Sequence, residues 1–482
     1  MEVVNNFFRT NRRHKIGLII LSGSLVFFSL WRLPYSPATW FDEGINIGIA
    51  KSLIQDGVYS LKIGPGQFVA ERPFLITTNY PVLIPVAVSL KIFGISLTAA
   101  RVPQVLFLWL FCLLAYLLVK KIYSPEAALL SLALIVTFSP FYGNGKAVLG
   151  EVPGLAYLLG GLLLLSGEFK TKKFFAAGLL FGLSAATKPF FLIVLPALLI
   201  GEIFNYAKTR ALFWKRSFTL LAGLIIPLVL WLTTIISPFS LAEFGKTVGY
   251  YSNSYAGSNF LELVVLNARR FFTERTPIHF LLLLSVGLAG FVHAFKKNRF
   301  TEIEVILSTI IIITLAWYLK TPGWYRYFFP AHLLLLLFFP GALLAATLRR
   351  LAITVVVCLI IVQFGYLLTR RHDPLYNSDS AVRFSETVLS ATSPTDTIFV
   401  INSPSAVFLL DGRPARQFLQ INPKLFFGKN SLQDEQGSWY PYVVTSGVLE
   451  NSSILHADEI LAKQYSPVIT VDKYLLYKKR TP

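Results

Sequence analysis

The stretch YRYFFPAHLLLLLFFPGALLAATLRR (residues 325–350) decides what kind of fold this chain can adopt. Between Arg326 and the pair Arg349-Arg350 it holds a predominantly apolar run from 327 to 347. A helix needs about 20 mostly apolar residues to span the hydrocarbon core of a bilayer. We therefore expect a membrane-spanning helix here, with a basic pair at one of its ends.

The same pattern recurs along most of the chain. Of the 482 residues, 54% are hydrophobic and only 14% are charged, whereas soluble proteins carry about 25% charged residues. Predominantly apolar runs lie near 16–33, 81–97, 102–119, 125–141, 152–167, 174–187, 190–206, 218–237, 277–295, 303–319, 327–347 and 350–369. These runs predict a multi-pass membrane protein.

Lysine and arginine gather in short clusters between the apolar runs. The clusters lie at 9–15, 120–121, 170–173, 208–216, 296–299 and 349–350. This distribution is typical of cytoplasmic loops in membrane proteins. The formal net charge of +19 therefore does not indicate a nucleic-acid partner.

The clusters also decide which runs cross the membrane. If every cluster is cytoplasmic, an even number of crossings separates neighbouring clusters, yet three runs lie between 9–15 and 120–121. The weakest of the three is 81–97, because two prolines and a lysine interrupt it and a glycine ends it. We expect 81–97 to be interfacial or re-entrant. The other eleven runs then place the N-terminus in the cytoplasm and the C-terminus outside it.

This topology predicts two domains. Residues 1–371 form a transmembrane domain, which includes a first extracytoplasmic loop at 34–100 with interfacial helices. Residues 372–482 form a small extracytoplasmic α/β domain, because TDTIFVIN and SPVITVDKYLLYKK alternate as β-strands do. The expected fold class is thus an α-helical polytopic membrane protein with a small C-terminal α/β domain. Cys112 and Cys358, the two cysteines, lie inside apolar runs, so we expect no disulfide framework.

Two adjacent acids, Asp42 and Glu43, stand in the first loop, in WFDEGINIGIAKSLIQDG (40–57). The apolar residues that follow have helical spacing, which predicts an amphipathic helix on the membrane surface with the acids at its start. Another acid, Glu151, opens a later helix in GNGKAVLGEVPG (143–154). In one interpretation Asp42 caps its helix, and Glu43 and Glu151 complement the dipoles of theirs. In the other, Asp42 is a general base beside a lipid substrate, and Glu151 as a second acid supports that role.

Three basic side chains are expected on the same side of the membrane: Arg72 in AERPF, Lys188 in AATKPFF and Arg326 in GWYRYFFP. Snorkelling at helix ends is one explanation for such residues. However, outer loops are normally poor in basic residues, and a phosphate held at the outer leaflet would explain all three. Acids beside these cations suit transfer from a lipid phosphate. A carboxylate would deprotonate the acceptor, while the cations stabilise the departing phosphate.

These stretches resemble the GT-C membrane glycosyltransferases, in particular the dolichyl-phosphate-mannose protein mannosyltransferases and the aminoarabinose transferases of lipid A. The resemblance spans most of residues 15–350. It rests on the order and sidedness of FDEG, PVLIPVAVSLKIFGISLTAARVP, LGEVPG, LSAATKPFFLIVLP and WYRYFFPAHLLLLL. The tail TDTIFVINSPSAVFLLDGRPAR resembles the outer domain of many members.

The resemblance implies an inverting transfer of a sugar from a polyprenyl-phosphate donor at the extracytoplasmic face, to a lipid, glycan or protein acceptor. By motif, Asp42 resembles the first-loop catalytic acid and Glu151 the second-loop acid. Glu43 or Glu151 would orient the acceptor or the sugar. Lys188 and Arg326 resemble contacts to the donor phosphate.

Some positions depart from the family pattern. The second-loop acid is often aspartate in relatives. Many relatives also carry a basic residue directly before a proline, where this chain has Asn79-Tyr80-Pro81, and Arg72 lies several residues upstream. Use of a divalent metal ion varies among relatives, so such an ion is a candidate cofactor, although the sequence shows no metal-binding cluster.

Three other functions remain open at this stage. An oligosaccharide ligase with a lipid-pyrophosphate donor needs similar groups. A flippase or secondary transporter would place charged groups near the bilayer midplane. A structural or regulatory polytopic protein that has lost activity is the third, and substitution of Asp42 would then have little effect on its function. We expect a prokaryotic plasma membrane as the location. Neither the sugar nor the acceptor can be read from the sequence.

Overall fold

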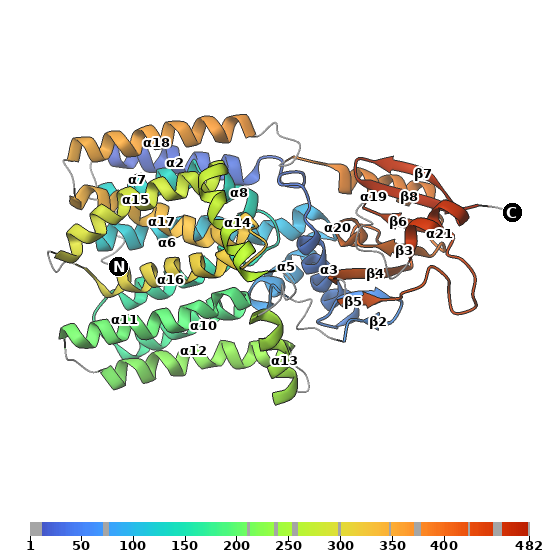
Figure 1. Ribbon diagram of the computed structural model, residues 1–482, viewed down its shortest axis with the longest axis horizontal. Helices are drawn as coiled ribbons and strands as arrows, with labels where there is room; N and C mark the ends of the chain where they lie inside the picture. Colours follow the sequence, from blue (N-terminus) through green and yellow to red (C-terminus); the bar gives the residue numbers. More distant parts are fainter. Residues whose placement is uncertain are drawn as a thin grey trace.

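The protein is a helical bundle with a β-sheet domain at one end (Figure 1). The computed structural model describes residues 12–70, 77–209, 213–235, 240–252, 259–296, 300–346, 349–370, 377–422, 425–446 and 456–480. The long helices run side by side along the long axis of the molecule. This arrangement confirms the expected fold class.

Helices cover all eleven runs that the sequence analysis predicts to cross the membrane. They are α2 (Arg12–Leu30), α6 (Leu97–Ile122), α7 (Pro125–Val136), α8 (Ser139–Gly145), α9 (Glu151–Leu165), α10 (Thr171–Thr187), the 3-10 helix η1 (Pro189–Ile193), α11 (Val194–Thr209), α12 (Phe213–Ile235), α15 (Arg275–Lys296), α16 (Glu302–Leu319), α17 (Tyr325–Ala346) and α18 (Arg349–Arg370). Among the described residues, seven helices are long and apolar enough to cross, or up to eight if α7 and α8, bent by 67°, form one span. By this criterion alone, helices such as α9, with 15 residues, are too short to count.

The segment predicted not to cross forms a separate short helix. Helix α5 (Tyr80–Phe93) has 14 residues, which gives a length of about 21 Å, less than the roughly 30 Å of a hydrocarbon core. It lies beside α3 at the end of the bundle that faces the sheet (Figure 1). Val82 and Val86 are buried, whereas Ile84 and Val88 are exposed. One apolar face therefore packs on the protein, and the other is available to lipid.

Helix α17 lies at the centre of the bundle. Its residues from Leu333 to Leu337 are fully buried, in a core that also includes side chains of α6, α7 and α9. Exposed apolar side chains lie instead on the outer helices, among them Ile225 of α12 and Ile361 of α18. An apolar core under an apolar exterior is the pattern of a helix bundle in lipid.

The sheet-side end of the bundle carries the first loop and the C-terminal domain. The first loop contributes α3 (Phe41–Asp56), β1 (Lys62–Gly64), β2 (Gln67–Phe68) and α5, and two further helices at the periphery are α13 (Leu241–Ser252) and α14 (Phe260–Thr273). The C-terminal elements are α19 (Ser380–Ala391), β3 (Ile398–Ile401), α20 (Pro404–Val407), β4 (Ala415–Asn422), β5 (Leu425–Gly428), β6 (Tyr442–Thr445), α21 (Ala457–Gln464), β7 (Tyr465–Val471) and β8 (Tyr474–Lys479).

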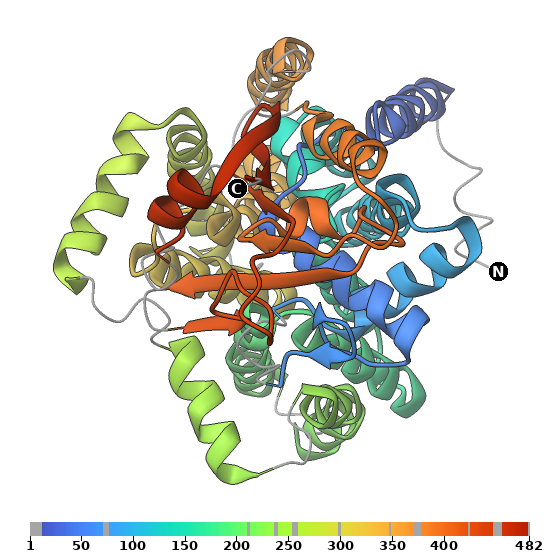
Figure 2. The ribbon, with the colours of Figure 1, turned by 90° about the vertical axis from the view of Figure 1, so that its right-hand side faces the viewer.

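The six C-terminal strands form one mixed sheet in the order β5-β4-β3-β6-β8-β7. Strand β3 pairs in parallel with β4 and β6, and the remaining pairs are antiparallel. The segment TDTIFVIN contains β3, and SPVITVDKYLLYKK folds into the hairpin of β7 and β8. The sheet lies across the end of the bundle (Figure 2).

The C-terminal domain is joined to the first loop by direct contacts. Lys51 of α3 donates to the carbonyl of Phe408 over 3.1 Å and pairs with Asp411 at 2.9 Å. A Cβ at Gly44 would lie only 2.4 Å from the carbonyl oxygen of Pro404. The glycine of the FDEG motif is therefore required for the close approach of α3 to α20.

We predict that Gly44→Ala destabilises the protein by about 1–3 kcal/mol, because the methyl group would overlap the backbone of α20. Thermal unfolding in detergent measures this loss. Gly23→Ala is the matched control, since no atom lies within 4 Å of a Cβ at Gly23. Equal melting temperatures for the two variants would contradict the tight contact.

Candidate active site

Asp42 lies in the first turn of α3 and forms an ion pair with Arg326. The Nη1 of Arg326 donates to Oδ2 of Asp42, from the first turn of α17. Asp42 is not the N-cap, a position held by Trp40. The capping interpretation therefore does not describe Asp42, whose carboxylate reaches another helix. Its side chain remains 28% exposed.

Aromatic rings hold the guanidinium of Arg326 in place. Its Cζ lies 4.8 Å from the ring centre of Trp324 and 5.2 Å from that of Tyr327. The hydroxyl of Tyr327 accepts a bond of 3.4 Å from Nη2. Such cation–π contacts fix the direction in which the guanidinium presents its donors.

Glu151 and Lys188 form a second ion pair. Glu151 begins α9, and Lys188 Nζ donates to its Oε1 over 2.5 Å. Both side chains are buried, with 2% and 10% exposed. Lys188 has an extended backbone (φ −155°, ψ 137°) between α10 and η1, as expected for a residue before proline, which disfavours helical backbone. This break turns the lysine toward α9.

Glu43 forms a third ion pair, which is completely buried. Arg101 of α6 donates from Nε and Nη2 to the two carboxylate oxygens, over 2.8 and 2.7 Å, and both side chains are 0% exposed. The amides of Val148 and Trp40 also donate to Glu43, over 3.0 and 3.4 Å. These donors occupy both oxygens. The geometry thus favours a positioning role for Glu43 over the substrate contact considered from the sequence.

Backbone contacts bring the separate pairs into one site. The amide of Val148 donates to Glu43, and Asn46 of α3 donates to the carbonyl of Val148 over 2.7 Å. A Cβ at Gly150 would lie 3.4 Å from the Cβ of Lys188. The charge of Glu151 also interacts with Arg326. The start of α3, the loop before α9, the break at Lys188 and the start of α17 therefore meet at the sheet-side end of the bundle.

Several buried polar atoms at this junction have no hydrogen-bond partner among the described residues. They are Nε of Arg326, Oε2 of Glu151 and both amide atoms of Asn79. Asn79 is adjacent to the lysine break, because its backbone amide donates to the carbonyl of Thr187 over 3.0 Å. Buried polar groups are nearly always bonded in folded proteins. Partnerless donors and acceptors beside two ion pairs indicate a place where a polar ligand binds.

The structure thus brings together four of the six predicted site residues: Asp42, Glu151, Lys188 and Arg326. Glu43 lies directly behind them. The prediction for Arg72 lies outside the described residues. Sequence reasoning missed Arg101. The same argument could have found it, because basic residues are rare on the outer side of the membrane and each one there suggests a specific partner.

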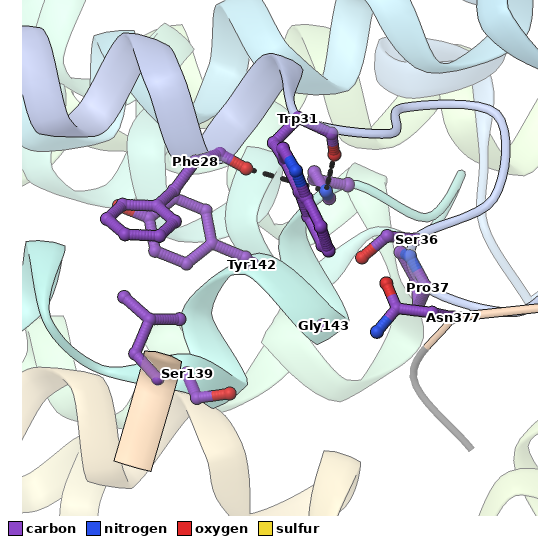
Figure 3. A pocket seen from close by; sticks show the side chains of 10 residues that line it. Phe28, Trp31, Ser36, Pro37, Ser139, Tyr142, Gly143 and Asn377 are labelled. Atoms are coloured by element: carbon purple, nitrogen blue, oxygen red, sulfur yellow. Dashed lines mark hydrogen bonds between the residues drawn. The ribbon is translucent and has the colours of Figure 1, made fainter. Parts of the chain in front are cut away.

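A second missed cation, Lys146, directly follows α8 and contacts the C-terminal end of α2. It is 1% exposed, and its amine donates to the carbonyls of Trp31 and Phe28 over 3.0 and 3.5 Å. It borders a small cavity that is also lined by Tyr142 and Asn377 (Figure 3). Burial, and then the charge of Arg101, lower the pKa of Lys146 to about 7.

A chain of buried polar side chains supports the start of α17. His332 bonds to the hydroxyl of Tyr325 at 3.1 Å and to His279 of α15 at 3.0 Å. His279 in turn contacts Gln363 of α18 at 3.3 Å, and Gln363 accepts from Thr137 over 2.9 Å. A fully bonded network of this kind fixes side-chain directions. It holds the helix end that presents Arg326.

We predict that Arg101→Met destabilises the protein by about 3–5 kcal/mol, because it leaves a buried carboxylate without its cation. The double variant Glu43→Gln/Arg101→Met should recover part of the loss. Arg349→Met, which breaks the exposed pair with Glu126, should change stability little. Thermal unfolding of these three variants, of the single variant Glu43→Gln and of the wild type tests this, and additive effects of the two substitutions would argue against a coupled pair.

The lowered pKa of Lys146 predicts a pH dependence of stability. Between about pH 7 and the ordinary lysine pKa of 10.5, the unfolded chain binds a proton that the folded protein does not. Stability should therefore rise with pH above 7, by at most about 1.4 kcal/mol per pH unit. Melting temperatures between pH 6 and pH 9 should show this slope in the wild type and a smaller slope in Lys146→Met. Identical slopes would mean that the lysine stays charged.

Comparison with known proteins gives one family match and several similar structures. Residues 83–241 match the family model described as dolichyl-phosphate-mannose-protein mannosyltransferase. No curated protein matches the chain significantly in sequence. The structure is similar to that of ArnT from Cupriavidus metallidurans bound to undecaprenyl phosphate, with a TM-score of 0.59 and 13% identity over 95% of this chain and 97% of that one.

It is also similar to the Archaeoglobus fulgidus oligosaccharyltransferase in complex with zinc and sulfate, with a TM-score of 0.51 and 15% identity over 90% of this chain and 68% of that one. At these identities the likeness establishes a shared fold. Together with the family match over residues 83–241, this likeness agrees with the resemblance drawn from the motifs. The chain is a multi-pass membrane protein that shares its fold with ArnT and the oligosaccharyltransferase.

Proposed function

We propose that the protein transfers a sugar, with inversion, from a polyprenyl-phosphate donor to an acceptor at the extracytoplasmic face of the plasma membrane. The observation that carries the proposal is the meeting of Asp42, Arg326, Glu151 and Lys188 at one end of the bundle. This end lies under the C-terminal domain (Figure 2). It supplies a carboxylate for proton transfer and two cations for a phosphate.

Asp42 is the general base in this proposal. Of the three acids its side chain is the most exposed, at 28%, compared with 2% for Glu151 and none for Glu43. An acceptor hydroxyl or amine gives its proton to Asp42 while the acceptor atom attacks the anomeric carbon. The bond from that carbon to the phosphate oxygen breaks, and its electron pair stays on the phosphate. Arg326 and Lys188 stabilise the charge that develops there.

Glu151 orients the sugar or the acceptor. Its Oε2 has no partner among the described residues, so it is available to accept a bond from a hydroxyl. Lys188 keeps the carboxylate paired until a ligand arrives. Burial of the site beneath the first loop and the sheet domain limits hydrolysis of the donor.

The choice of a polyprenyl-phosphate donor is supported by ArnT, the structural neighbour that was solved with undecaprenyl phosphate. The sidedness is supported by the positions of basic loops. The C-terminal ends of α11 and α17 and the starts of α12 and α18 lie at the end of the bundle opposite the sheet (Figure 1), and they include described residues of the clusters at 208–216 and 349–350. With these helix ends on the cytoplasmic side, the site and the C-terminal domain lie on the other side.

A resident metal ion does not fit the described site. No group of three or more histidine, cysteine or acidic side chains gathers among the described residues. The two acids that face the site, Asp42 and Glu151, are each paired with a cation. The proposed steps therefore use the side-chain cations of the described residues.

An oligosaccharide ligase with a lipid-pyrophosphate donor is the alternative, and one structural neighbour is an oligosaccharyltransferase. Its chain is longer, and this protein covers 68% of it. The ArnT chain is covered almost completely, at 97%. The extent of the match therefore favours the monophosphate donor.

We predict that Asp42→Asn lowers sugar transfer by about 10²–10⁴-fold, because the amide cannot accept the proton. The assay uses purified protein in detergent with a panel of radiolabelled polyprenyl-phosphate and polyprenyl-pyrophosphate sugars. Asp411→Asn is the matched control, since it removes a carboxylate paired to the same helix through Lys51. Turnover with pyrophosphate donors alone would favour the ligase. Undiminished transfer by Asp42→Asn would exclude Asp42 as the base.

A further inference from the structure

The two ion pairs of the site conflict with the tasks that the proposed function gives them. Asp42 must accept a proton, yet its carboxylate is neutralised by Arg326. Arg326 must bind the donor phosphate, yet one of its terminal nitrogens already donates to Asp42. Asp42 thus occupies one donor of Arg326 and places a negative charge where the phosphate must bind, so the intact pair opposes donor binding.

The two pairs differ in how easily they open. The pair of Glu151 and Lys188 is buried, and separating it would leave a charge without a partner in a poorly solvated place. Asp42 is the most exposed of the four side chains, so water can solvate its carboxylate after separation. The pair of Asp42 and Arg326 is thus the one that separates when the donor binds.

Within that pair, Asp42 is the partner that moves. The guanidinium of Arg326 is held against the rings of Trp324 and Tyr327, and its Nε is buried without an acceptor among the described residues. An arriving phosphate can accept bonds from Nε and from a terminal nitrogen, the two-point geometry that guanidinium groups favour.

We propose that Asp42 and the lipid phosphate compete for Arg326, so that donor binding releases the general base. This inference rests on the proposed function and deepens it. Without donor, Asp42 is neutralised and no base is available. With donor bound, the phosphate takes its place on Arg326 and the free carboxylate can accept the acceptor's proton.

The same competition acts after transfer. The acceptor's proton is then on Asp42, and the lipid phosphate has gained one negative charge by breaking its bond to the sugar. When Asp42 loses its proton to water, the carboxylate again competes with the product phosphate for Arg326. Release of the lipid product is therefore favoured once the base is regenerated.

The test measures binding of undecaprenyl phosphate to the purified full-length protein in detergent, for the wild type, Asp42→Asn and Asp411→Asn. Removing the internal competitor should make Asp42→Asn bind about five- to tenfold tighter, which is the scale of a partly exposed ion pair. Asp411→Asn should bind like the wild type. Undecaprenol, which lacks the phosphate, should not distinguish the three proteins.

The outcomes separate this inference from the function on which it rests. Equal or weaker binding of undecaprenyl phosphate by Asp42→Asn, with clear binding by the wild type, overturns the competition and leaves the transferase proposal standing. Binding by none of the proteins overturns both. Tighter binding of undecaprenol as well would show a general change at the lipid site, which also overturns the competition. Thermal unfolding confirms that each variant is folded, and Asp42→Ser serves in place of a variant that is not.

Discussion

The buried pair of Glu43 and Arg101 is the interaction on which the rest of the site depends. Two charges without solvent exposure are stable only when their donors and acceptors are satisfied, and here the fork of Arg101 matches both oxygens of Glu43. The remaining donors come from Trp40 and Val148. A single carboxylate thereby fixes α3, α6 and the loop before α9 relative to one another. Asp42 precedes Glu43, so the structural acid also sets the position of the chemical one.

The functional side chains stand where helices begin or break. Asp42, Glu151 and Arg326 each lie in the first turn of a helix, and Lys188 lies at the break before Pro189. Irregular backbone at the edge of a membrane is tolerated only where protein or water satisfies it. The first loop and the sheet domain cover this end of the bundle, and the bond from Asn79 to the carbonyl of Thr187 satisfies one freed acceptor.

The sequence was sufficient to predict those helices and strands that local residue patterns determine. Apolar length predicted the bundle helices, and the parity of basic clusters separated α5 from them. Alternation predicted β3 and the hairpin of β7 and β8. Helix length did not determine the number of membrane spans in the same way. Helices α9 and α10 have only 15 and 17 residues, and length alone does not show whether they cross.

The roles of adjacent acids could not be separated in the same way. Asp42 and Glu43 look equivalent in the sequence, but their partners lie 284 and 58 residues away. Only the contacts that the start of α3 makes with Arg101 of α6 and Arg326 of α17 decide which carboxylate is enclosed and which remains accessible. Arg101 was overlooked because its sequence position does not show its partner. An arginine at the start of an apolar run is also what a snorkelling side chain would give.

The three ion pairs together form a gradient of burial that matches their roles. The pair of Glu43 and Arg101 is fully enclosed, the pair of Glu151 and Lys188 is 2% and 10% exposed, and the pair of Asp42 and Arg326 is 28% and 12% exposed. Separating a pair is more costly the less water can solvate the parted charges. The enclosed pair is therefore suited to hold the frame, and the most exposed pair to exchange partners with a substrate. Placing the exchangeable pair one residue from the permanent one lets Asp42 change partners while α3 itself stays in place.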